Sequence, residues 1–70
     1  MIYVAEFETR KFWFRAVHTT EAGARDALAD GWDRHARNYP TATITRDEVL
    51  DSARITAYKP GECTMDGDKI

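Results

Sequence analysis

The segment from Thr20 to Tyr39 constrains the fold more than any other, because no other stretch is long and periodic enough to predict a complete helix. Apolar and aromatic side chains recur along it at intervals of three and four residues, which gives the helix one apolar face. We expect this face to cover a surface supplied by the rest of the chain, with Gly31 allowing a close approach. The face consists of Ala24, Ala27, Leu28, Gly31, Trp32, His35 and Tyr39.

Charged side chains occupy the opposite face of this helix, and three acidic residues each stand four positions before an arginine. Oppositely charged residues at this spacing lie side by side on a helix and form stabilising ion pairs. Pro40 predicts that the helix ends just before it. The expected pairs are Glu21 with Arg25, Asp30 with Arg34, and Asp33 with Arg37.

Two segments before the helix predict a β-hairpin. Ile2 to Glu8 and Phe12 to His18 are rich in β-branched and aromatic residues, and polar residues separate them. The connection is either a two-residue turn or a four-residue loop, and both choices pair Phe7 with Phe12. Because side chains alternate between the faces of a sheet, one apolar face results, and we expect it to meet the helix. This inner face consists of Tyr3, Ala5, Phe7, Phe12, Phe14 and Ala16.

A second, shorter helix is predicted after Pro40. Thr45 and Glu48 have the spacing of a capping box, and Ile44 and Val49 have the spacing of a hydrophobic staple. Both signals mark a helix start, so we expect a short helix from about residue 46 to residue 52.

The rest of the chain predicts a third strand and a tail. Small and apolar residues alternate with polar ones from Ala53 to Lys59, which is typical of a strand. Pro60 ends this strand, and the pair Asp66 and Gly67 is a strong turn signal. The tail therefore either forms a short closing hairpin or frays.

Together these elements predict one α+β domain over residues 1–70, with a small antiparallel sheet in ββαβ order. One main helix packs on one face, and a short second helix accompanies it. Seventy residues, 43% hydrophobic and 31% charged, suit a small globular domain rather than a disordered or membrane-spanning chain. The formal net charge of −2 argues against binding nucleic acid through bulk electrostatics.

Residues typical of catalysis and metal binding are few and scattered. His18, His35 and Cys63 lack the closely spaced pairs of a zinc site, and the isolated glycines match no phosphate-binding loop. We therefore expect a protein that is not an enzyme, with no catalytic residues, no metal and no cofactor. The single cysteine excludes an internal disulfide and favours the cytoplasm, and no segment predicts a leader peptide or a membrane span.

The outer face of the predicted sheet, which no helix covers, is the candidate binding site. Tryptophan, tyrosine and arginine are the residues enriched where proteins bind one another, and this face carries all three. Two alternatives stand: the face is free for a partner, or the tail or a second copy of the chain covers it. The candidate residues are Val4, Glu6, Trp13, Arg15, Arg54, Thr56 and Tyr58.

The same face permits a second interpretation as a small nucleic-acid-binding surface. Trp13 and Tyr58 would stack on bases, while Arg15, Arg54 and Lys59 would lie near phosphates. The excess of acidic over basic residues, 12 against 10, makes this the less favoured alternative.

The layout of hairpin over residues 2–18, helix over 20–39, and strand and turn over 54–67 resembles small phage and mobile-element inhibitors, among them some anti-CRISPR proteins. The resemblance lies in topology and not in a diagnostic motif. It implies a non-enzymatic inhibitor or adaptor that occupies a surface of a larger protein complex in the cytoplasm of a bacterial host. It transfers no individual functional residue to this sequence.

Overall fold

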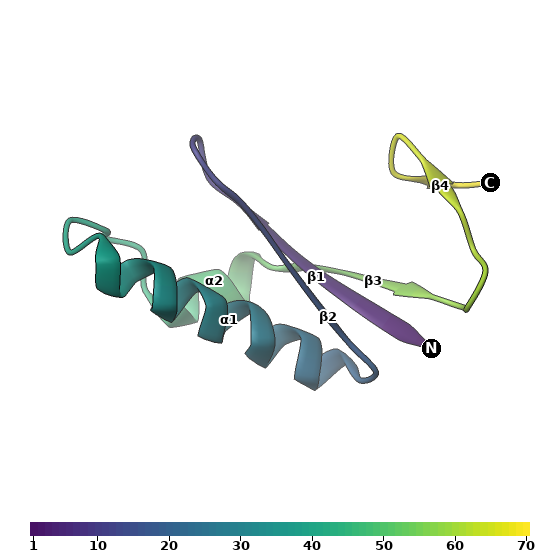
Figure 1. Ribbon diagram of the computed structural model, residues 1–70, viewed down its shortest axis with the longest axis horizontal. Helices are drawn as coiled ribbons and strands as arrows, with labels where there is room; N and C mark the ends of the chain where they lie inside the picture. The colour runs from purple at the N-terminus through teal and green to yellow at the C-terminus, as the bar shows by residue number, and fades with distance from the viewer.

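The computed structural model describes all of residues 1–70 and contains two helices and two antiparallel sheets (Figure 1). The larger sheet has three strands in the order β2-β1-β3, and the smaller pairs β4 with β5. This arrangement confirms the predicted α+β fold. The elements are β1 (Ile2–Glu8), β2 (Trp13–His18), α1 (Glu21–Asn38), α2 (Arg46–Ser52), β3 (Arg54–Tyr58), β4 (Thr64–Met65) and β5 (Asp68–Lys69).

The register of the β1–β2 hairpin differs from the prediction by two residues. Phe7 pairs with Phe14 rather than with Phe12, and Glu8 pairs with Trp13. The four-residue loop therefore begins one position later than expected, because the Thr9 hydroxyl accepts hydrogen bonds from the backbone N–H groups of Lys11 and Phe12. A shift of two leaves every side chain on its predicted face.

The core lies between the inner face of the sheet and the two helices, as the apolar stripe predicts. Phe7 and Phe14 meet the Trp32 ring edge-on, at centroid distances of 5.8 and 5.4 Å. This small core holds seven buried residues of 70, so each one carries a large share of the packing. They are Ala5, Phe7, Ala24, Leu28, Ala29, Trp32 and Val49.

Helix α2 covers part of the charged face of α1, and this corrects two of the three predicted ion pairs. Glu21 pairs with Arg25 at 3.5 Å as expected. Asp30 and Asp33, however, both pair with Arg46 of α2, at 2.8 and 2.6 Å. Their hydrogen bonds to Arg46 raise the pKa of its guanidinium. A sequence pattern within one helix cannot reveal a competing partner on another helix.

The expectation that Gly31 allows a close approach between helix and sheet is wrong. A Cβ atom built at Gly31 would meet only the Arg34 side chain, at 3.6 Å. Gly23 is the crowded position instead, because a Cβ there would clash with Nδ1 of the His18 imidazole. That nitrogen accepts a hydrogen bond from the backbone N–H of Thr20, so the imidazole is fixed over the first turn of α1.

The predicted start of α2 is confirmed. The Thr45 hydroxyl accepts a hydrogen bond from the backbone N–H of Glu48 at 3.2 Å, and the helix spans Arg46–Ser52. Ile44 packs against the core cluster that contains the buried Val49, as the staple predicts. The indole N–H of Trp32 donates to the Ile44 carbonyl, which joins this connection to α1.

The tail forms the short hairpin that was one of its two predicted outcomes. Strands β4 and β5 meet at a turn in which Asp66 and Gly67 have φ values of 53° and 87°. Positive values at both central positions are the requirement of a type I′ turn, which Asp-Gly meets. In Figure 1 this hairpin extends away from the two helices, near the end of β3.

Candidate partner-binding face

The outer face of the three-stranded sheet brings the predicted site residues together. Cross-strand pairing sets Glu6 of β1 beside Arg15 of β2 and Arg54 of β3, and sets Val4 beside Thr56. Six of the seven predicted residues line one hollow of about 340 Å³, and the seventh, Val4, lies in the neighbouring row. The hollow is lined by Glu6, Trp13, Arg15, Arg54, Thr56 and Tyr58, together with Thr64 and Gly67 of the tail.

Glu6 is the centre of this face. Its Oε2 atom accepts a hydrogen bond from the indole N–H of Trp13 at 3.2 Å. The same oxygen lies 3.8 Å from Arg15 and 4.0 Å from Arg54, and 17% of the Glu6 side chain is exposed. One carboxylate thus faces two guanidinium groups, so the middle of the sheet carries an excess of positive charge.

Trp13 is held in place and yet open to solvent. The Arg15 guanidinium lies 4.4 Å from the centroid of its ring, within the range of a cation–π contact. Together with the hydrogen bond to Glu6, this contact stabilises the observed orientation of the indole, while 59% of the residue is exposed. An ordered and exposed tryptophan loses little conformational entropy when a partner covers it.

The tail hairpin forms one wall of the hollow without closing it. The Lys69 ammonium donates to the carbonyl of Ala57 in β3 at 2.9 Å and lies 5.5 Å from the Tyr58 ring centroid. It also pairs with Glu62 at 3.0 Å. That interaction, aided by a hydrogen bond from the backbone of Lys59, lowers the pKa of Glu62.

The sequence-based site omitted two residues of the same face. Ile2 pairs with Tyr58, and Val17 pairs with Val4, so both lie beside the predicted site. Val17 is 57% exposed and Ile2 is also exposed, which gives the face an apolar end next to its charged centre. Strand alternation already assigned both residues to the outer face, so the signal was present in the sequence.

The outer face presents side chains of the kinds that are enriched at protein interfaces. The outer face offers an exposed indole, two arginines and two exposed aliphatic side chains, which are the groups that bind a complementary surface. No group of three or more histidine, cysteine, aspartate or glutamate side chains is arranged to hold a metal ion.

Comparisons with known proteins give this chain no relative. The chain matches no protein-family model, no curated protein and no solved structure.

Neither of its helices has the length and apolar character that a membrane span requires.

Proposed function

We propose that the protein is a non-enzymatic binding module that docks on a larger protein through the outer face of its sheet. The observation that carries this proposal is the ordered, 59% exposed Trp13 between Glu6 and Arg15. Interfaces concentrate their binding energy in a few such aromatic and arginine residues, surrounded by contacts that exclude water. Ile2 and Val17 supply an apolar border of this kind.

The charge of the face indicates the chemistry of the partner. Arg15 and Arg54 share one carboxylate, and 72% of the Arg54 side chain is exposed. A partner surface with a carboxylate opposite the two guanidinium groups and an apolar pocket for the indole complements it. A continuous phosphate backbone fits less well, because Glu6 lies between the two cations.

The resemblance to small phage and mobile-element inhibitors gives this function its specific form. In that form the module occupies a surface of a bacterial immune complex and blocks its activity. A plaque assay tests it: a phage restricted by a CRISPR system should form plaques when the host expresses this protein. Restoration by the wild type but not by the double variant Trp13→Ala, Arg15→Ala would support the specific form, and unchanged restriction by every system tested would contradict it.

The general proposal is tested by comparing variants in affinity capture. Tagged wild-type protein and the double variant Trp13→Ala, Arg15→Ala are each mixed with bacterial lysate, once with and once without nuclease treatment. The matched control, Asp26→Ala with Arg34→Ala, changes exposed residues of α1 outside the face. We expect one protein complex to bind the wild type and the control, and binding to the double variant to weaken by about 2 kcal/mol or more, because hot-spot truncations have this cost.

Three results would contradict the proposal. The partner binds the double variant as tightly as the wild type, recovery depends on intact nucleic acid, or only further copies of the chain are recovered. In the last case light scattering would report a dimer, and the outer face or the free edge of β2 would be its interface.

A further inference from the structure

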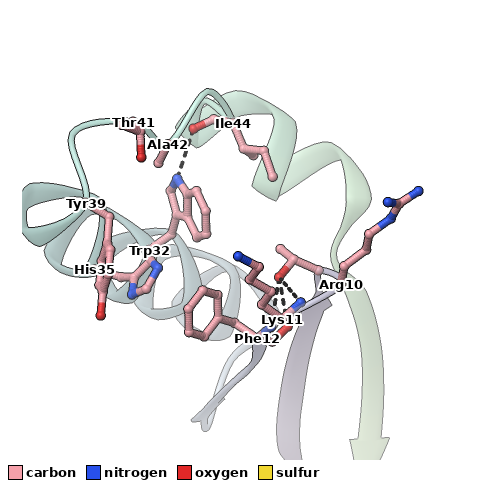
Figure 2. A pocket seen from close by; sticks show the side chains of 10 residues that line it. Arg10, Lys11, Phe12, Trp32, His35, Tyr39, Thr41, Ala42 and Ile44 are labelled. Atoms are coloured by element: carbon pink, nitrogen blue, oxygen red, sulfur yellow. Dashed lines mark hydrogen bonds between the residues drawn. The ribbon is translucent and has the colours of Figure 1, made fainter.

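A second groove lies at the opposite side of the sheet from the proposed docking face. It is bounded by the β1–β2 loop, the end of α1 and the connection to α2 (Figure 2). Its volume is about 360 Å³, which is within the range of sites that hold small molecules or single groups of larger ones. The residues that line it are Thr9, Arg10, Lys11, Phe12, Trp32, His35, Tyr39, Thr41, Ala42 and Ile44.

Aromatic rings form one side of this groove. The His35 and Tyr39 rings are stacked, with centroids 4.5 Å apart and an angle of 29° between their planes. The Phe12 ring meets His35 at 4.6 Å and lies 6.1 Å from Tyr39. Tyr39 is 50% exposed and Phe12 is 41% exposed, so both rings are open to a planar ligand.

Unpaired positive charge forms the other side. Arg10 and Lys11 project from the hairpin loop (Figure 2), and neither takes part in any ion pair of the protein. No acidic residue lines the groove. The C-terminal end of α1 contributes about −0.5 elementary charge through its dipole, which two full positive charges exceed. The groove is therefore positively charged although the whole chain has a net charge of −2, and its charge is complementary to that of an anion.

Two side-chain polar groups of the groove are already used within the protein. The Thr9 hydroxyl accepts from the backbone of its own loop, and the Trp32 indole donates to the Ile44 carbonyl at 3.1 Å. The groups that remain open to a ligand include the exposed rings and the two cations. Proteins bind single-stranded nucleic acid with this combination of stacking surfaces and positive charge.

From these contacts we propose that the groove binds single-stranded nucleic acid. A base stacks on the exposed rings of Tyr39 and Phe12, and the neighbouring phosphates lie beside Arg10 and Lys11. The groove lies on the helix side of the sheet, so a strand bound there leaves the outer face free. This inference does not depend on the proposed protein partner.

The test measures the anisotropy of a fluorescent single-stranded oligonucleotide of uniform sequence during titration with the full chain at several salt concentrations. For two phosphate contacts, the logarithm of the association constant should fall with the logarithm of salt concentration with a slope of about −1.4, which is about −0.7 for each contact. Lys11→Ala should reduce the slope to about −0.7. Lys59→Ala is the matched control, because it removes an equal charge outside the groove.

Tyr39→Ala separates stacking from charge. We expect it to weaken binding by about 5- to 150-fold at one salt concentration, without a change in the slope, because stacking on one ring contributes this much. Tyr39→Phe retains the ring and should retain binding. Tyr39→Phe keeps the ring stacked on His35, so its thermal unfolding should match that of the wild type. A thermal unfolding curve of Tyr39→Ala verifies that this variant is folded at the temperature of the titration.

Several results would overturn the proposal. They are no binding at low salt, binding that Lys11→Ala and Tyr39→Ala leave unchanged, and equal competition by polyglutamate, which would indicate an acidic peptide. A mononucleotide that binds as tightly as the oligonucleotide would also overturn it, since the site would then be one for a free nucleotide.

Discussion

At the scale of single residues, the two glycines of α1 have opposite roles. Gly31 has free space beside it, whereas Gly23 leaves room for the His18 imidazole. Glycine inside a helix costs about 1 kcal/mol relative to alanine. At Gly31 the chain bears this cost without a packing benefit, and at Gly23 it gains the hydrogen bond between His18 and Thr20.

We expect Gly31→Ala to raise the free energy of unfolding by up to about 1 kcal/mol, because the added Cβ meets only the movable end of Arg34. Gly23→Ala should give no such gain, since its Cβ displaces the His18 ring. Chemical denaturation measures both values. In a His18→Ala background, Gly23→Ala should become stabilising by about 1 kcal/mol. Equal effects of the two substitutions in the wild-type background would contradict this account.

At the scale of elements, the tail hairpin is held to the sheet mainly by the contacts of one side chain, that of Lys69. Its ammonium joins Glu62, the Ala57 carbonyl and the Tyr58 ring. Strands β4 and β5 have two residues each, and none of these four residues is buried, so little apolar packing supplements these contacts. The position of the tail beside the docking face is therefore sensitive to the charge of Glu62.

We expect acid to release the tail. The pKa of Glu62 lies below its usual value of 4.5 in the folded protein, so its ion pair stabilises the docked tail above that pH. The contribution disappears as pH falls through the lowered pKa. The protection factors of the β4 and β5 amides, which are corrected for the intrinsic pH dependence of exchange, should fall there while those of β1 stay high. Lys69→Gln should lower the same protection factors at neutral pH, whereas no change in that variant would show that other contacts hold the tail.

At the scale of the whole molecule, stability depends on a small core beneath a large exposed surface. Seven buried residues support a chain of 70, and α1 supplies four of them. A domain of this length has a total stability of roughly 4–10 kcal/mol. The removal of one large core side chain is therefore comparable with the whole.

Leu28→Ala should lower the free energy of unfolding by about 2–5 kcal/mol, because Leu28 is 2% exposed in the middle of the core cluster. Leu50→Ala is the matched control, since the same atoms are removed from a half-buried position on α2 and the cost should be smaller. Urea denaturation followed by tryptophan fluorescence measures both. Similar losses for the two variants would show that the core extends further under α2 than the buried residues indicate.

Much of the fold was predictable because its signals are local. Three signals determine the conformation of residues close to them in the sequence: the apolar period of α1, the capping box at Thr45 and the Asp66–Gly67 turn. The outer face was predictable for the same reason, because alternation survives a register shift of two. The structure therefore has three residues on the outer face that strand alternation predicts for them: Trp13, Arg15 and Arg54.

The sequence by itself determined which residues form helices and strands and which face each strand residue occupies, since backbone geometry repeats at fixed periods. Only the tertiary structure decided the partners across elements. Arg46 pairs with the carboxylates of Asp30 and Asp33, and the hairpin loop places Lys11 in the same groove as Tyr39 at the end of α1. Contacts of this kind depend on how the helices and strands pack against one another, and this packing is determined by the whole core.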